Sequence, residues 1–317
     1  MAQRMNILID TFTIKARKRD DLTNPITAAL HNVGHSGSQL GHNVRFGNDM
    51  DAPSCVWLFG SITRRKMDTE RARTIQHHRS NGTPTFALDS GLFSTYIRRK
   101  TNSSESNFFR VGFGDCVGTG DFLNETSTAE RYEWFKQAYD FSEQKPTKNF
   151  DGPILFLLQT ERGWQYDNLE PYKDWARQTL LRIREYTDRP VTLRAHPNHA
   201  REPLDYIAAG VNNVSYQYGE RSRRSSIDAI REASAVVTHS SSSAIESYIE
   251  GIPTFALDRR CLGYNHFCND LSKINDLNLY NWDSRYQNLC DWAMTTWHIE
   301  EFKNPKLIDY YLKKAKL

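Results

Sequence analysis

Short apolar runs alternate with amphipathic helical patterns along most of the chain, and this alternation constrains the fold more than any other feature. In the second half, residues 153–158 form an apolar run, residues 172–186 have a helical pattern, and residues 191–195 form another apolar run. Parallel strands need a crossover between them, so a strand–helix–strand alternation predicts a largely parallel sheet covered by helices. We therefore expect an α/β protein with two Rossmann-like domains.

A polar segment at residues 143–149, which contains Pro146, interrupts the alternation and is the candidate domain linker. We expect domains over residues 1–145 and 146–285, followed by C-terminal helices over residues 286–317 that pack back on the first domain. Residues 101–128 are rich in Gly, Ser, Thr and Asn and are expected to form a loop region. The expected strands cover residues 5–9, 55–59, 84–88, 153–158, 191–195, 214–218, 235–238 and 254–257. The expected helices cover residues 26–40, 71–79, 129–138, 172–186, 226–233, 244–250 and 288–302.

The composition is that of a globular protein, with 38% hydrophobic and 25% charged residues among 317. No run approaches the roughly 18 consecutive apolar residues of a membrane span, and the N-terminus lacks the apolar core of a signal peptide. We therefore expect a cytoplasmic protein, in the host cytoplasm if it is phage-encoded. The five cysteines are scattered without metal-pair spacing, so free thiols and no structural zinc are expected.

The net charge of +3 is unevenly distributed. The first 100 residues carry 15 Lys and Arg against 8 Asp and Glu, whereas the rest of the chain is slightly acidic. Such clusters of basic residues often form ordinary solvated surface, but three in one domain also fit a surface that attracts a polyanion. The clusters are residues 15–19, Arg64-Arg65-Lys66 and Arg98-Arg99-Lys100.

Residues 238–243, Thr-His-Ser-Ser-Ser-Ser, follow the apolar run at 235–238 and precede a helical pattern. Backbone N–H groups at a helix start attract an anion, and serine hydroxyls add hydrogen-bond donors. One serine is enough to cap a helix, so four in succession favour a phosphate site over capping alone. The candidate phosphate ligands are Ser240, Ser241 and Ser242.

Other polar residues are expected at the same edge of this sheet, because the carboxyl ends of parallel strands meet there. His196 follows the strand at 191–195, where Pro197 fixes the departing chain, and its imidazole can donate a hydrogen bond to a phosphate. The loop after residues 153–158 adds Gln159, Thr160 and Arg162. Arg162 is the phosphate partner expected there, with a solvated surface arginine as the alternative.

Glu246 lies several residues into the helix after the serines, and a Gly251-Ile252-Pro253 turn follows. A carboxylate at this place can reach the ribose hydroxyls of a bound nucleotide. The alternative is an ordinary helix-surface glutamate, which is what we expect of Glu250. Residues 238–258 resemble the donor-binding segment of GT-B-fold glycosyltransferases, in which small residues begin a helix, a glutamate contacts the ribose and a Gly-x-Pro turn follows.

The His196-Pro197 pair and the serine cluster together are similar to the His-Pro and Ser-Ser motifs of bacterial capsule glycosyltransferases, including sialyl- and Kdo-transferring enzymes. In that family the two motifs bind donor phosphates. The resemblance covers about residues 153–260 and implies a GT-B-type fold with a deep interdomain cleft. It also implies a nucleotide sugar as co-substrate, a UDP-sugar before others, with His196 and the serines on its phosphates and Glu246 on its ribose. No obligatory cofactor or metal ion is expected, since residues 146–285 contain no Asp-x-Asp motif.

Residues 292–301, Trp-Ala-Met-Thr-Thr-Trp-His-Ile-Glu-Glu, resemble the closing segment of bacteriophage proteins thought to glycosylate modified pyrimidines in DNA. A helix whose tryptophans pack on the core is the alternative. With the basic clusters, this resemblance implies transfer to a hydroxylated or hydroxymethylated pyrimidine in double-stranded DNA, contacted by the arginines and lysines of 64–66 and 98–100. Capsule or lipopolysaccharide glycosylation, epimerisation of a nucleotide sugar, and nucleic-acid binding without catalysis are the other readings. The sequence does not predict an oligomeric state.

An inverting transfer needs a base in the first domain that takes a proton from the acceptor hydroxyl. Asp89 directly follows the strand at 84–88 and is the first candidate. Asp115, Asp121 and Asp10 are its rivals, the last because it ends the first strand. A retaining transfer needs no such base, and the sequence leaves both courses open.

Overall fold

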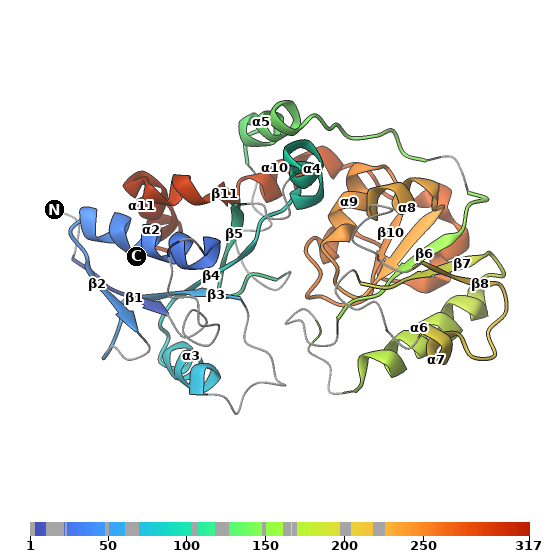
Figure 1. The fold of residues 1–317 in the computed structure, drawn as a ribbon, viewed down its shortest axis with the longest axis horizontal. Helices are drawn as coiled ribbons and strands as arrows, with labels where there is room; N and C mark the ends of the chain where they lie inside the picture. The colour runs from blue at the N-terminus through green and yellow to red at the C-terminus, as the bar shows by residue number, and fades with distance from the viewer. Residues whose placement is uncertain are drawn as a thin grey trace. The chain divides into compact units, whose positions relative to one another are not determined.

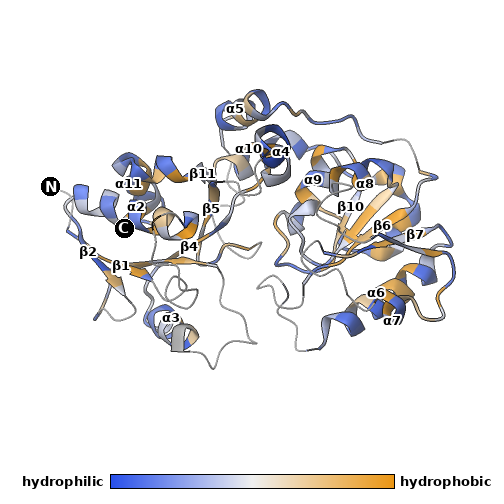
Figure 2. Cartoon of the chain, in the orientation of Figure 1, coloured by the Kyte–Doolittle hydropathy of each residue, from blue (hydrophilic) through white to orange (hydrophobic). Residues whose placement is uncertain are grey.

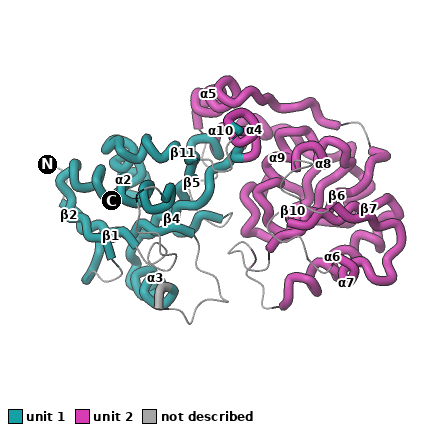
Figure 3. Tube along the Cα trace, in the orientation of Figure 1, with its two compact units in different colours: residues 1–94, 102–125, 292–317 teal, residues 95–101, 126–291 magenta. Residues whose placement is uncertain are grey.

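The structure, a computed structural model, describes residues 4–10, 22, 24–47, 51–60, 70–102, 107–117, 127–147, 150–160, 166, 170–196, 204–217 and 226–317. The chain divides into two compact units, each with its own sheet (Figure 3). Unit 1 comprises residues 1–94, 102–125 and 292–317, and unit 2 comprises residues 95–101 and 126–291.

The sheet of unit 1 has the strand order β11-β5-β4-β3-β1-β2. The first four strands along the chain pair in parallel, whereas β5 is antiparallel to β4, and β11 is antiparallel to β5. All residues of β3 are buried, as expected for a central strand covered on both faces. The strands are β1 (Asn6–Asp10), β2 (Asn43–Gly47), β3 (Cys55–Phe59), β4 (Thr85–Ser90), β5 (Phe108–Phe113) and β11 (Thr296–His298).

Helix α2 of unit 1 begins at a well-formed cap, because the Asn24 side chain accepts a hydrogen bond from the Ile26 N–H at 3.1 Å and Pro25 occupies the first helical position. Near its other end, the Ser36 hydroxyl donates to the Phe302 carbonyl at 2.7 Å and ties α2 to residues 292–317. The helical segments of this unit are α2 (Pro25–Gln39), α3 (Glu70–Ser80), η5 (Ile299–Lys303) and α11 (Pro305–Lys314).

Several segments differ from the sequence prediction, among them strand β2 and the helices at residues 94–101 and 204–208, none of which was expected. Residues 101–128 were expected to form a loop region, but they contain β5, whose single strand signal is the short run Phe-Phe-Arg-Val-Gly-Phe. The single helix expected over residues 288–302 was wrong: helix α10 (Arg285–Ala293) ends, and β11 then pairs with β5. Threonine and tryptophan favour strands, and this pairing satisfies the backbone groups on the facing edges of β5 and β11.

The sheet of unit 2 consists of five parallel strands in the order β10-β9-β6-β7-β8 (Figure 1). Counted along the chain from β6, this is the order 5-4-1-2-3, which matches the first five strands of the Rossmann order 3-2-1-4-5-6. With the mostly parallel sheet of unit 1, it confirms the expected α/β fold class of two Rossmann-like domains. The strands are β6 (Ile154–Leu157), β7 (Val191–Arg194), β8 (Val214–Gln217), β9 (Ala235–Thr238) and β10 (Thr254–Ala256).

Strand β6 is buried on both faces, which is why its sequence is uniformly apolar (Figure 2). Phe156 packs in a cluster with Leu180 of α6, whereas the neighbouring Leu155 packs with Ile230 of α8. The helices of this unit, apart from α10, are α4 (Ser94–Thr101), α5 (Glu130–Tyr139), α6 (Tyr172–Tyr186), α7 (Leu204–Ala208), α8 (Ser226–Glu232) and α9 (Ser243–Ile249). Short 3-10 turns η2 (Tyr264–His266), η3 (Leu271–Asn275) and η4 (Leu277–Leu279) follow β10.

The polar segment expected as a linker runs along unit 2. The Gln144 N–H donates to the Ile249 carbonyl at 2.8 Å, and the Thr147 N–H donates to the Gly251 carbonyl at 2.8 Å. Gly251 has φ +71°, and a Cβ there would lie 2.4 Å from the Lys145 carbonyl oxygen. This close approach therefore requires glycine.

The five cysteines are free thiols, as expected, and four of them are buried. Within the described ranges, no helix has the length and apolar character needed to cross a bilayer.

Candidate functional site

The sheet of unit 2 has a topological switch point between β6 and β9. From β6 the chain proceeds to β7 on one side, whereas β9 and β10 are added on the other side. In open α/β sheets, ligands bind outside the carboxyl ends of the strands at such a point. Leu157 pairs with both Arg194 and Thr238, the last residues of their strands. The register therefore aligns in one row the three residues that lie two positions beyond these strand ends. The residues of this row are His196, Gln159 and Ser240.

Gln159 joins the ends of the two central strands. Its buried side-chain oxygen accepts a hydrogen bond from the Ser240 N–H at 2.8 Å, and the Ser240 hydroxyl lies 3.4 Å from the same oxygen. The Gln159 N–H donates to the Tyr172 hydroxyl at 2.8 Å. Gln159 thus orients the turn that carries the serines. Thr160 and His196, also predicted here, are both half-buried.

The serines differ in exposure: Ser240 is buried, Ser241 is half-buried and Ser242 is exposed. The Ser241 hydroxyl accepts a hydrogen bond from the Ser243 N–H at 3.2 Å, whereas Ser242, at the cap of α9, makes no side-chain capping bond. The N–H groups of Ser240, Ser241 and Ser243 already donate within the protein, to Gln159, Thr238 and the Ser241 hydroxyl. The Ser241 and Ser242 hydroxyls are therefore the groups that this turn offers to an anion.

A buried histidine that the sequence analysis did not single out lies under the serine turn. The Nδ1 atom of His239 lies 2.8 Å from the Ser240 hydroxyl, and its Nε2 atom lies 3.6 Å from a carboxylate oxygen of Asp258. Burial lowers the pKa of His239 to about 4; Asp258 opposes this shift and Arg260 adds to it. The imidazole is therefore neutral at pH 7. Two rings pack edge-on against it, those of Tyr166 and Trp175.

Asp258 extends the polar row to the fourth strand. Because Ala256 pairs with Thr238, the register aligns Asp258 with the serine turn, and the Asp258 N–H donates to the His239 carbonyl at 3.1 Å. The Arg260 N–H in turn donates to the Asp258 carboxylate at 2.8 Å. This brings a half-buried arginine to the same edge. The sequence signal that could have indicated Asp258 and Arg260 was the expected strand at residues 254–257, because these two residues closely follow it.

Glu246 and Glu250 are both buried, so the expectation that Glu250 is a surface residue was wrong. The Glu250 carboxylate accepts from the Tyr96 hydroxyl at 2.9 Å and pairs with Arg231 at 2.7 Å. Glu246 accepts hydrogen bonds from the hydroxyls of Thr95 and Ser226, the latter at 2.7 Å. A carboxylate has about four lone-pair sites, so Glu246 retains capacity for a ribose hydroxyl.

The predicted basic residues of α4 are exposed: Arg98, Arg99 and Lys100 belong to its last turn. Arg99 lies 3.9 Å from Asp228, and Lys100 lies 3.7 Å from Asp140. Exposed pairs of this kind are weak, so the cations can be redirected to another anion. Other predicted residues lie outside the described ranges: Arg64, Arg65, Lys66, Asp121, Arg162 and Pro197.

The candidate bases of unit 1 lie in different places. Asp89 is buried in an ion pair with Arg110 and also accepts from the Ser90 N–H at 2.8 Å. Asp115 belongs to the turn after β5, which begins at the amino end of β4, because β5 is antiparallel. Asp10 is buried at the carboxyl end of β1, where the strand order of this sheet reverses between β1 and β3.

The described residues contain no group of three or more His, Cys, Asp or Glu side chains that could hold a metal ion. The chain does contain one Asp-x-Asp run, Asp49-Met50-Asp51, whose first two residues lie outside the described ranges.

The chain matches no protein-family model and no curated protein. Among solved structures, the KpsC β-Kdo 2,4-transferase of Thermosulfurimonas dismutans is 14% identical, with a TM-score of 0.48 over 88% of this chain and 92% of that chain. The UDP-GlcNAc 2-epimerase of Methanocaldococcus jannaschii, in complex with UDP-GlcNAc and UDP, is 10% identical, with a TM-score of 0.35 over 99% of each chain. Both similarities are distant.

Proposed function

We propose that the protein is a glycosyltransferase that binds a nucleotide sugar, a UDP-sugar before others, at the carboxyl edge of the unit 2 sheet. The row of polar side chains at the switch point supports this proposal, because that edge is where open α/β sheets hold nucleotides. In the proposed complex, His196, Ser241 and Ser242 contact the donor phosphates. Glu246 binds the ribose, and the Arg162 guanidinium adds a positive charge beside the phosphates.

These groups suit a donor whose leaving group is a phosphate. Negative charge grows on the leaving oxygen as the glycosidic bond breaks, and fixed hydrogen-bond donors stabilise that charge. The Gln159 side chain holds the serine turn through the Ser240 N–H, so the donors need little reorganisation when the ligand arrives.

The donor site is tested by the double substitution Ser241→Ala with Ser242→Ala. Loss of two hydroxyl contacts to a charged phosphate should weaken binding of the nucleotide sugar at least about tenfold, measured by isothermal titration calorimetry against a panel of nucleotide sugars. Ser272→Ala, an exposed serine on η3 of the same unit, is the matched control. Equal affinity of the double variant and the wild type rejects the phosphate assignment.

For the acceptor, we propose a hydroxymethylated pyrimidine in double-stranded DNA. The basic first hundred residues and the exposed Arg98, Arg99 and Lys100 support a polyanion, and such binding should weaken steeply with salt. Incubation of hydroxymethylated DNA with the donor panel, followed by mass analysis of the nucleosides, measures transfer directly. A mass gain only on a glycan acceptor would identify the capsule-type activity instead, and conversion of the donor without any acceptor would identify an epimerase.

For the base, we propose a unit 1 carboxylate, and three asparagine substitutions compare the candidates. Asp10 lies at the switch point of its sheet, whereas the carboxylate oxygens of Asp89 are engaged by Arg110 and the Ser90 N–H. Asp10→Asn should therefore reduce turnover and spare donor affinity. A larger and equally selective loss in Asp89→Asn or Asp115→Asn would move the role to that residue.

A further inference from the structure

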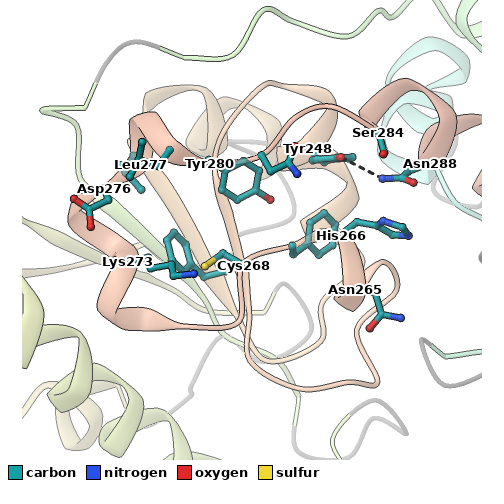
Figure 4. A pocket seen from close by; sticks show the side chains of 14 residues that line it. Tyr248, Asn265, His266, Cys268, Lys273, Asp276, Leu277, Tyr280, Ser284 and Asn288 are labelled. Atoms are coloured by element: carbon teal, nitrogen blue, oxygen red, sulfur yellow. Dashed lines mark hydrogen bonds between the residues drawn. The ribbon is translucent and has the colours of Figure 1, made fainter.

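A cavity of about 540 Å³ lies in unit 2 beside the edge strand β10 (Figure 4). Its lining comes from the C-terminal half of α9, from β10 and from residues 265–288, which run from η2 into the first turn of α10. Phe255 of β10 forms a bridge to Cys268, which anchors this segment along the edge of the sheet. None of the residues assigned above to donor binding lines this cavity.

Part of the wall is a set of aromatic rings held rigidly by their neighbours. The Tyr248 ring stacks on Trp282 at 5.5 Å between centroids and meets Phe267 edge-on at 5.3 Å. The Asn288 amide donates to the Tyr248 hydroxyl at 3.3 Å. The Tyr248 and Phe267 rings are both buried and form a fixed support. The half-buried Tyr280 ring and the exposed Leu279 therefore present the apolar surface that a ligand can reach.

Several polar groups of the wall have hydrogen-bonding capacity to spare among the described residues. The Tyr280 hydroxyl is buried beside Thr254 without a hydrogen bond of normal geometry, and Figure 4 shows it directed toward the middle of the ring of side chains. The Asn281 oxygen accepts from the Asp283 N–H at 2.8 Å, which leaves its amide N–H groups. The Ser284 hydroxyl also lines the cavity.

The charges of the wall balance. Among the described residues of the wall, Lys273 is the single full cation and Asp276 the single full anion. Burial lowers the pKa of His266, which keeps that ring neutral near pH 7. A phosphate or a polyanion would find too little positive charge here, and a lipid chain would leave the amides and hydroxyls unpaired.

We propose that this cavity binds a neutral saccharide unit. Sugar hydroxyls both donate and accept, so they match the Tyr280 hydroxyl, the Asn281 amide and the Ser284 hydroxyl. The C–H face of a pyranose ring is apolar and packs on the Tyr280 ring and Leu279. The volume is within the range of small-molecule sites. Because its lining shares no residue with the donor site, the cavity binds its ligand independently of that site.

The test uses saturation-transfer NMR and calorimetry on the full chain with neutral monosaccharides and disaccharides, and with uridine and adenosine as nucleoside probes. Tyr280→Phe removes one oxygen, and Asn281→Ala removes one amide. Each should weaken saccharide binding about five- to tenfold, the effect of a lost hydrogen bond. Asn278→Ala, an exposed asparagine on η4 that does not line the cavity, is the matched control and should bind like the wild type.

The Ser241→Ala, Ser242→Ala protein separates this proposal from the donor site, because it should keep full saccharide affinity while losing the nucleotide sugar. Thermal unfolding of each variant shows that it is folded. Binding of no saccharide, binding of the nucleosides alone, or equal affinity in Tyr280→Phe, Asn281→Ala and the wild type would overturn the assignment.

Discussion

The neutral, buried His239 should make the stability of unit 2 depend on pH. Its imidazole is 1% exposed, and burial lowers its pKa from 6.5 to about 4. Between these values the unfolded chain binds a proton that the folded chain excludes, so the free energy of unfolding falls as the pH falls. The stabilisation that comes from keeping His239 neutral is complete above pH 6.5 and is lost progressively as the pH decreases to about 4.

The size of the effect follows from the two pKa values. Each tenfold difference in proton affinity corresponds to about 1.4 kcal/mol, so the full loss is about 3 kcal/mol below pH 4. About 2 kcal/mol of this is lost by pH 5. A domain of this size shifts its Tm by about 2–4 °C per kcal/mol, so His239 should lower the Tm by about 4–8 °C between pH 7.5 and pH 5.

Substitution His239→Asn isolates this contribution, because asparagine has no titrating group but can still accept a hydrogen bond from the Ser240 hydroxyl. Differential scanning calorimetry at pH 7.5 and pH 5 measures the Tm of the wild type and the variant. The fall in Tm should be about 4–8 °C smaller in the variant. His35→Asn, which changes an exposed histidine on α2, controls for loss of an imidazole and should fall like the wild type. The same fall in Tm for wild type and His239→Asn would refute the reasoning.

Two further substitutions test packing in each unit. Gly251→Ala places a Cβ 2.4 Å from the Lys145 carbonyl oxygen at φ +71°, and should lower the free energy of unfolding of unit 2 by about 1–3 kcal/mol in chemical denaturation. Gly210 has a similar φ of +72° but open space around it, so Gly210→Ala should lower the free energy of unfolding by less. Equal losses of stability in the two variants would contradict the clash. Arg110→Leu leaves the Asp89 carboxylate buried without its ion-pair partner and should cost about 3–5 kcal/mol of unit 1 stability. Adding Asp89→Leu to Arg110→Leu should recover much of that loss, and a double variant no more stable than the single one would contradict it.

The fold of unit 2 was predictable because four of its strands, β6, β7, β9 and β10, are buried along their whole length and therefore have mostly apolar sequences, whereas the edge strand β8 is partly exposed. The predicted strand at 235–238 coincides with β9, and the predicted helix at 172–186 coincides with α6. The two antiparallel strands of unit 1 were not predictable in this way. β5 lies between a polar run at residues 101–107 and a glycine-containing segment that begins at Gly112, and the partner of β11 lies more than 180 residues away. Neither strand therefore has a local signal strong enough to show its pairing.

The candidate site was predictable where residues follow a strand directly, and not where side-chain contacts decide. Gln159 and Ser240 were expected at one sheet edge, and the structure joins them through a hydrogen bond. The place of His239 under that edge depends on aromatic rings from α6 and the loop before it, which no spacing in the sequence reveals. The Arg110 pair of Asp89 was equally hidden, because Arg110 lies on the strand that the sequence analysis missed.

The pairing of β11 with β5 sets the order in which the protein can mature on the ribosome. All of the strands of unit 2 are translated before residues 296–298, so its sheet can be complete while β5 still has one edge without its partner. An unpaired edge attracts other chains, and slow synthesis prolongs its exposure. Residues 292–317 therefore act as the closing segment of a domain begun nearly 300 residues earlier, and a premature stop before β11 should yield a folded unit 2 joined to an aggregation-prone unit 1.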